Sequence, residues 1–128
     1  MAEEFKHKEI TDRIIGACYA VHRYLGNGYP EVIYQRALAY ELTSFNLKFQ
    51  RELDRNSYYR NFEEPIGKRC ADFIVEGKIL LELKAVGKLD DASFSQSLNY
   101  LKVFKLEVGL LINFGSTKLE IRRLIMDR

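Results

Sequence analysis

Three charged residues stand in two stretches of sequence that otherwise consist of core-forming apolar residues. Asp72 lies in the stretch ADFIV, and Glu82 and Lys84 lie in the stretch ILLELKA. A charged side chain in a protein core is costly to desolvate unless it is paired or binds a metal ion. The two stretches therefore indicate a site, provided that the fold brings the three charges together.

The turn between the two stretches decides whether the charges meet. Side chains of a strand point alternately to opposite faces, so a two-residue loop around Gly77 would put Asp72 and Glu82 on opposite faces of a hairpin. An odd-length loop puts them on one face. The other face then gathers apolar residues only: Ala71, Phe73, Val75, Ile79, Leu81, Leu83 and Ala85. Because a face packed under helices should be wholly apolar, the sequence favours the odd register.

Two carboxylates on one face of a hairpin favour a metal ion between them. Directly opposed side chains have Cβ atoms about 5 Å apart, and two carboxylates about 4 Å apart repel by roughly 4 kcal/mol at an effective dielectric constant of 20. A neighbouring lysine or protonation relieves part of this repulsion. A divalent cation relieves it most directly, and Mg²⁺ favours one or two carboxylates completed by waters and phosphate oxygens.

Spacing alone leaves a structural alternative open. Glu82 and Lys84 could form an exposed ion pair on a solvated sheet face, which would contribute less than about 1 kcal/mol to stability. Asp72 could pair with Arg69 or Lys68.

Hydrophobic periodicity predicts the elements that position these residues. Apolar residues at helical spacing predict helices over residues 8–25, 30–45 and 91–104. Strand-like patterns predict six strands, over residues 47–53, 57–62, 69–75, 78–85, 107–115 and 118–125. The order ααββββαββ predicts an α/β protein of α+β character, in which helices pack on a mixed β-sheet.

The composition is that of an ordinary globular protein. The chain has 128 residues, 30% of them charged, and a net charge of +2, which predicts one domain over residues 1–128. No run approaches the roughly 18 apolar residues of a membrane helix and the N-terminus has no signal-peptide core, so we expect a cytoplasmic protein without membrane contact. Cys18 and Cys70 lack CxxC spacing and are expected to be reduced and buried. His7 and His22 lie in no ligand spacing with them, which argues against a zinc site.

Several motifs together resemble a known family. Asp72 followed by Glu82-Leu83-Lys84, in consecutive strands before a helix, resembles the active-site signature of the PD-(D/E)xK nuclease superfamily. The stretch GYPEVIY, residues 28–34, fits the pattern of the GxxExxY protein family, and QSLNYLK and GLLINFG are also similar to that family. The chain departs from these patterns at Ala71, where the superfamily has its namesake proline, and at Ser93, where many family members have a histidine.

The resemblance implies a restriction-endonuclease-like fold and a metal-dependent nuclease acting on DNA or RNA. Asp72 and Glu82 would bind Mg²⁺ or Mn²⁺, with the Leu83 carbonyl and Glu31 as further ligands. Lys84 would hold or polarise the attacking water and stabilise the charge that builds on the phosphate.

The resemblance also implies residues that contact the substrate. Gln96 and Tyr100, one turn apart on the helix over residues 91–104, would line the site. Lys68, Arg69 and Lys88 are among the basic residues that would contact phosphates. Each position has a structural reading as well: Glu31 could complement the helix dipole, Gln96 could be an ordinary exposed residue, and Tyr100 could pack with its hydroxyl at the edge of the core.

A nucleic acid is the partner that this interpretation requires. The modest net charge favours a small or structured substrate, or a homodimer that presents two basic patches. A second function class stays open, namely a non-catalytic module that binds nucleic acid or protein and retains the nuclease fold. The sequence has no Walker loop, no GxSxG motif and no Rossmann fingerprint, which argues against other enzyme chemistry.

Overall fold

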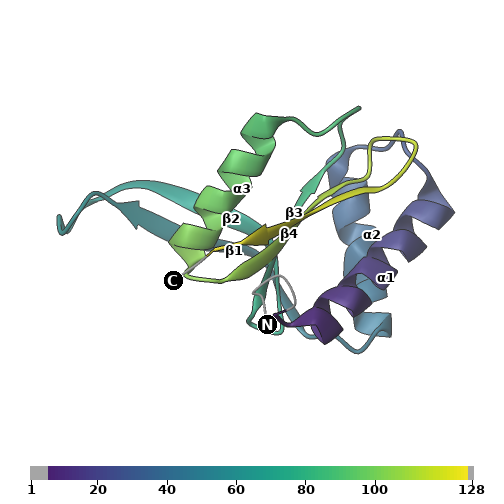
Figure 1. The fold of residues 1–128 in the computed structure, drawn as a ribbon, viewed down its shortest axis with the longest axis horizontal. Coiled ribbons are helices and arrows are strands. Elements are labelled where there is room, and N and C mark those ends of the chain that lie inside the picture. The colour runs from purple at the N-terminus through teal and green to yellow at the C-terminus, as the bar shows by residue number, and fades with distance from the viewer. Residues whose placement is uncertain (1–5, 127–128) are drawn as a thin grey trace.

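A mixed β-sheet with helices on both faces forms the body of the protein (Figure 1). The computed structural model describes residues 6–126. Within them the elements are α1 (Lys8–Leu25), α2 (Glu31–Ser44), β1 (Phe49–Tyr58), β2 (Pro65–Val75), β3 (Ile79–Lys84), α3 (Asp91–Phe104), β4 (Val108–Asn113) and β5 (Glu120–Ile125).

The five strands lie in the order β1-β2-β3-β4-β5. Neighbouring strands are antiparallel except β3 and β4, which are parallel. A parallel pair needs a long crossover, and α3 is that crossover. The predicted fold class, a restriction-endonuclease-like mixed sheet flanked by helices, is confirmed.

The predicted strand count was wrong, since five strands replace six within the described residues and the order is ααβββαββ. The two strands expected over 47–53 and 57–62 are replaced by one strand, β1, which pairs with β2 from Phe49–Val75 to Tyr58–Pro65. Residues 59–62 are not strand and lie in the connection between β1 and β2. We call residues 54–69, the outer half of this hairpin, the arm. The arm projects past the helices (Figure 1), so its side chains are solvated and need not alternate between apolar and polar. A strand without that alternation reads as a loop in the sequence.

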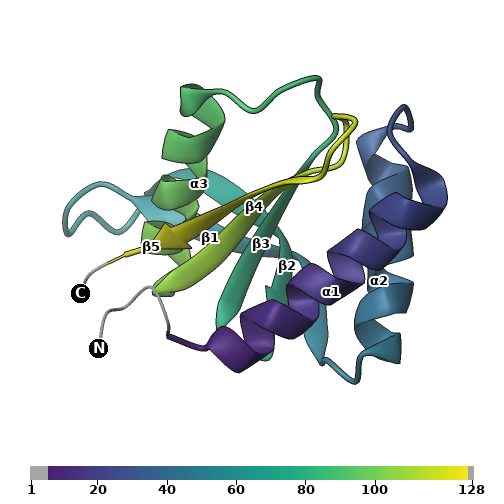
Figure 2. The ribbon, with the colours of Figure 1, turned by 45° about the vertical axis from the view of Figure 1, so that its right-hand side comes forward.

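The helices cover opposite faces of the sheet (Figure 2). On the face covered by α1 and α2, the α1/α2 face, Tyr34 and Leu38 of α2 belong to one buried cluster with Phe73 and Leu81. On the other, the α3 face, Leu101 belongs to a second cluster that includes Ile74, Leu80, Leu111 and Leu124. Burying one such side chain contributes about 1.5–3 kcal/mol, so both layers hold the sheet in place.

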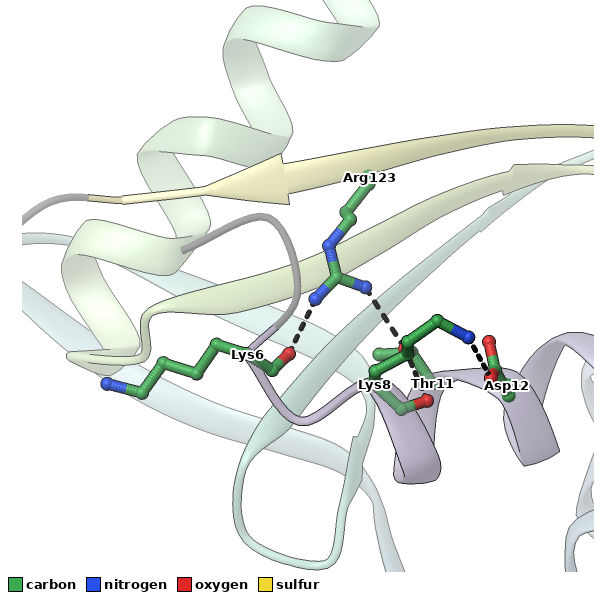
Figure 3. A network of polar contacts seen from close by, with 5 residues as sticks. All are labelled: Lys6, Lys8, Thr11, Asp12 and Arg123. Carbon is green, nitrogen blue, oxygen red and sulfur yellow. Dashed lines mark hydrogen bonds and ion pairs between the residues drawn. The ribbon is translucent and has the colours of Figure 1, made fainter. Parts of the chain in front are cut away.

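A polar contact anchors the start of α1 to the edge strand β5 (Figure 3). The Arg123 guanidinium donates to the Thr11 hydroxyl at 3.0 Å and to the Lys6 carbonyl at 2.5 Å. Lys8 and Asp12 form an ion pair at 2.6 Å one turn apart on the helix. The first turn of α1 is thereby fixed over the sheet.

The two cysteines are free, as predicted, but only Cys18 is buried. Cys70 is exposed, contrary to the prediction, because it pairs with Asp54 on β1 where the arm leaves the helix layers. Among the described residues no helix has the length and apolarity to cross a membrane.

Candidate metal centre

The hairpin of β2 and β3 brings Asp72 and Glu82 opposite each other. Phe73 pairs with Leu81 and Val75 with Ile79, so the loop is residues 76–78 and the predicted odd register is confirmed. Gly77 has a φ of 66°, a left-handed conformation that glycine adopts without strain. The next opposed positions beyond Phe73–Leu81 are Asp72 and Glu82, which we call the acidic pair.

Each carboxylate of the acidic pair is held by the backbone of the opposite strand. The Asp72 amide donates to Glu82 Oε2 at 3.2 Å, and the Leu83 amide donates to Asp72 Oδ2 at 2.8 Å. Because the N–H and C=O of one strand residue point to the same side, the Leu83 carbonyl also points toward β2. The two carboxylates and this carbonyl therefore face the gap where β2 and β3 diverge.

The side chains around the acidic pair follow the predicted faces with one exception. Ile74 and Leu80 lie on the α3 face, as the odd register requires. Ala71 lies there too, and not on the α1/α2 face as predicted. Glu52 lies in β1 opposite Asp72, between the register pairs Arg51–Phe73 and Leu53–Ala71. It has a left-handed φ of 51°. The alternation that the prediction assumed ends between Phe73, on the α1/α2 face, and Ala71, on the α3 face.

Burial and mutual repulsion dominate the electrostatics of the acidic pair. Glu82 is 8% exposed, and its burial together with the Asp72 carboxylate raises the pKa of Glu82 to about 9. Burial raises the pKa of Asp72 to about 6, with the Glu31 charge acting in the same direction and the hydrogen bond from Leu83 acting against it. Lys84 lowers the pKa of both acids. An exposed Glu82–Lys84 ion pair, the structural alternative, is therefore wrong, since Glu82 is buried.

Glu31 approaches the site from the α1/α2 layer. It is the first residue of α2, and Gln35 donates to its Oε1 at 3.3 Å. Burial raises the pKa of Glu31 while the charge of Lys84 lowers it. The charge of Glu31 also raises the pKa of both members of the acidic pair, which couples the start of α2 electrostatically to the site.

The donors present suit a cation that keeps part of its water shell. Within residues 6–126 no three His, Cys, Asp or Glu side chains lie close enough together to hold a metal ion. Two carboxylates and one carbonyl match the sites of Mg²⁺, which retains waters and takes substrate phosphate oxygens as ligands. The acidic pair with the Leu83 carbonyl fits this requirement, and Glu31 as a direct ligand stays a prediction.

Tyr100 and Arg69 border the acidic pair on the α3 face. The Arg69 guanidinium lies 5.7 Å from the centroid of the Tyr100 ring and donates to Asn99 Oδ1 at 3.2 Å. Burial and then the Glu82 charge raise the pKa of Tyr100, while Arg69 lowers it. Arg69 therefore stacks on α3 and does not form the ion pair with Asp72 that the alternative interpretation allowed. Gln96, one turn before Tyr100, is exposed.

The remaining basic residues of the prediction lie apart from one another. Lys68 pairs with Asp54 at 3.6 Å, and because it neighbours Arg69 in β2 its side chain points to the opposite face. Lys88 is exposed in the segment between β3 and α3. Of these three residues only Arg69 contacts α3, where it stacks on Tyr100.

Sequence reasoning missed Asn113, a fully buried residue at the end of β4. Its Oδ1 accepts the amides of Val86 and Gly115 at 2.9 and 3.0 Å, and its Nδ2 donates to the Val86 carbonyl and to Glu120 Oε1 at 2.9 and 2.8 Å. A Cβ on Gly115 would lie 2.4 Å from the Val86 amide nitrogen. Asn113 and Gly115 thus fix the segment that directly follows Lys84. A polar residue ending an apolar run before Gly115 was the available signal.

Glu52 is the second residue that the sequence did not single out. It is exposed on β1, and its charge raises the pKa of Asp72. Nothing in the pattern around it indicated this proximity, because the left-handed φ that places it is a tertiary feature.

Comparison with known proteins agrees with this geometry. A sequence model described as the PD-(D/E)XK nuclease superfamily matches residues 8–124. A solved structure described as "Crystal structure of SSO0001" is similar with a TM-score of 0.58 at 19% identity, over 77% of this chain and 51% of that chain. The chain thus spans about half the length of that protein, and the likeness concerns the fold alone. No curated protein matches the sequence.

Proposed function

This chain belongs to the PD-(D/E)XK nuclease superfamily, and from that premise we propose that it is a metal-dependent nuclease that hydrolyses phosphodiester bonds in DNA or RNA. The observation that carries the proposal is the acidic pair, in which Asp72 and Glu82 are desolvated side by side and each is oriented by a backbone amide. Such an arrangement concentrates negative charge that a divalent cation would neutralise.

Three groups would hold the metal, which we propose to be Mg²⁺ or Mn²⁺. They are the carboxylates of Asp72 and Glu82 and the carbonyl of Leu83, and Glu31 would act as a further ligand through a water. When bound, the metal supplies a water of lowered pKa and neutralises charge on the phosphate. The hydrogen bonds from backbone amides to both carboxylates would then orient these ligands toward the metal.

Lys84 would act on the attacking water. It leaves β3 two residues after Glu82, is partly exposed, and has no carboxylate within 4 Å among the described residues. An ammonium group free of an ion pair can orient a nucleophilic water and stabilise charge on the phosphate oxygens. Tyr100 and Arg69 would contact the neighbouring phosphate from the α3 face.

Within the superfamily we propose membership of the GxxExxY family, with a structural role for the tyrosine of that motif. Tyr34 is fully buried, stacks on Phe114 at 4.9 Å between ring centroids, and donates to the Gly26 carbonyl at 2.6 Å. Gly28 has a φ of 108°, which suits glycine. These two residues shape the turn that presents Glu31 to the site.

A non-catalytic binding module is the second candidate. One oxygen of each carboxylate already accepts a backbone amide, and the described residues contain no three-ligand acidic cluster. These are the properties expected of an acidic pair whose only role is to hold β2 and β3 together where the two strands diverge.

Cleavage tests with a matched lysine control separate the two candidates. The protein is incubated with Mn²⁺ and labelled single-stranded, duplex and branched DNA and RNA. Lys84→Ala should abolish cleavage, whereas Lys78→Ala, an exposed lysine at the opposite end of β3, should leave it unchanged. Cleavage that survives Lys84→Ala, or that is absent with every substrate although metal binds, would contradict the nuclease proposal.

A further inference from the structure

The arm carries aromatic side chains far from the core. Tyr58, Tyr59, Phe62 and Ile66 are each more than half exposed. They lie at the tip of the β1–β2 hairpin, which extends beyond α3 (Figure 1). Large apolar side chains gathered at an exposed hairpin tip are unusual on a monomer and indicate a contact surface.

Two arginines connect this tip to the site. Arg55 of β1 and Arg69 of β2 are register partners in the sheet. Each guanidinium lies over an aromatic ring of α3, Arg55 at 5.6 Å from the Phe104 centroid and Arg69 at 5.7 Å from the Tyr100 centroid. Tyr100 and Phe104 are one helical turn apart, so the two stacked pairs form a row along α3.

This arginine pair lacks an internal counterion. Like charges directly opposite each other across two strands are destabilising. Within residues 6–126 neither guanidinium has a carboxylate within 4 Å, and the nearby Asp54 is engaged by Lys68. The ring faces hold both guanidiniums in place but do not neutralise them, so the pair is suited to binding an external anion. Guanidinium groups bind phosphate with particular geometric specificity.

A groove of about 570 Å³ runs between the arm and the end of α3. Arg55, Asn56 and Tyr58 line one side, and Phe104 and Lys105 line the other. From Phe104 in the wall of the groove, the row of stacked pairs continues along α3 to Tyr100. Arg55 and Lys105 therefore place two positive charges in the groove, next to the carboxylate of Asp54, which pairs with Lys68.

The tip offers surfaces on which flat rings could stack. Tyr59 and Phe62 are parallel within 7° with centroids 6.1 Å apart, and the Arg60 guanidinium lies 5.3 Å from the Tyr59 centroid. Their exposed fractions are 52% and 64%. Aromatic side chains interleaved with arginine are the usual way of holding unpaired bases without sequence preference.

We propose that the arm and α3 bind a single-stranded nucleic acid, with its backbone on Arg55 and Arg69 and its bases on Tyr59 and Phe62. The inference rests on the proposed function, because the metal centre defines where this strand begins. A single strand is the occupant because stacking on the tip needs unpaired bases. The net charge of +2 also suits a ligand held by few phosphate contacts better than a duplex bound through many.

Binding in EDTA tests the arm without cleavage. Fluorescence anisotropy of the full chain is measured with labelled oligo-dT, oligo-U and a duplex over a range of salt concentrations. Arg55→Gln and Arg69→Gln should each weaken single-strand binding and lower the salt slope by about 0.7 per lost phosphate contact. Tyr59→Ala and Phe62→Ala should each weaken it about 5- to 150-fold. Arg36→Gln, an exposed arginine of α2, is the control and should change neither quantity.

Three outcomes would overturn the inference: arm variants that bind like wild type, a duplex that binds as tightly as the single strands, or an Arg36→Gln variant that weakens binding as much as the arm variants. The tip residues are outside both buried clusters, so Tyr59→Ala remains informative even if an arginine variant unfolds.

Cleavage is assayed separately in Mn²⁺. If the arm variants retain full Lys84-dependent cleavage of single strands, only the inference about the arm is refuted. Arm-dependent binding without any cleavage refutes only the nuclease proposal.

Discussion

Replacing Glu82 by glutamine should stabilise the metal-free protein. Glutamine has the same shape and keeps an oxygen that can accept the Asp72 amide at the 3.2 Å position of Glu82 Oε2. It removes the charge whose burial, together with repulsion by Asp72, raises the pKa of Glu82 to about 9. The substitution therefore keeps the hydrogen bond and removes the electrostatic cost.

The sign of the effect follows from proton linkage. In the unfolded chain Glu82 ionises at its ordinary pKa of 4.5, whereas in the folded protein it holds its proton up to about pH 9. Between these limits the folded state binds more protons, so the free energy of unfolding falls as pH rises, by at most about 1.4 kcal/mol per pH unit. For a chain of this size about 1 kcal/mol corresponds to about 4 °C in Tm. Wild type without metal should lose up to about 5 °C per unit between pH 6 and 8.

The variant should have a flatter pH profile and no response to metal. At pH 8 we expect Glu82→Gln to be at least about 1 kcal/mol more stable than metal-free wild type. Metal at a hundred times its Kd should stabilise wild type by about 2.7 kcal/mol, or roughly 10 °C, and leave the variant unchanged. Thermal unfolding followed by circular dichroism, at pH 6, 7 and 8 with EDTA or Mn²⁺, measures both effects.

Glu76→Gln is the matched control. Glu76 also accepts a backbone amide, that of Lys48 at 2.8 Å, but it lies at the turn of the β2–β3 hairpin away from the acidic pair. This control should keep the pH slope and the metal response of wild type. The reasoning fails if metal-free wild type becomes more stable from pH 6 to 8, or if Glu82→Gln is less stable than wild type at pH 8.

Three further substitutions test the frame of the site, each by urea unfolding at 25 °C. Gly115→Ala should cost about 1–3 kcal/mol, because its Cβ would lie 2.4 Å from the Val86 amide nitrogen; a neutral result would mean that the segment after Lys84 yields easily. Asn113→Asp keeps the size but replaces the Nδ2 donor to the Val86 carbonyl by an acceptor, and should cost at least about 2 kcal/mol. Tyr34→Phe removes the hydroxyl bonded to the Gly26 carbonyl and should cost about 1 kcal/mol, while any Mn²⁺-dependent cleavage should persist; loss of cleavage at unchanged stability would give Tyr34 a chemical role.

Local patterns were sufficient to predict the elements that carry the site. Apolar residues at helical spacing predicted α1, α2 and α3 because each helix has one face against the sheet. The register of β2 and β3 followed from one requirement, that a buried face be apolar, and this brought Asp72 opposite Glu82. Both inferences use periodicity within a single element or hairpin, which is the information that a sequence holds most directly.

Features that depend on distant parts of the chain were not predictable in this way. The arm is a hairpin because β1 continues to pair with β2 beyond the helix layers, where no burial pattern marks the strands. Ala71 lies on the α3 face while Phe73 lies on the α1/α2 face, a change of face next to the acidic pair that strict alternation does not predict. Asn113 contacts Val86 and Glu120 from opposite sides, and these contacts exist only once the sheet has formed.

The hydrogen bonds of the acidic pair have a structural cause, but its charge does not. After Leu81, strand β3 ends its pairing with β2 and continues only beside β4, where Leu83 pairs with Ile112. The amides of Asp72 and Leu83 then lose their ladder partners, and a buried amide must find another acceptor. Asparagine and glutamine would satisfy both amides without the desolvation cost that two carboxylates carry. Since stability alone would favour those amides, the two ionisable groups beside Lys84 support the proposed divalent cation, which would offset the cost of ionising Glu82.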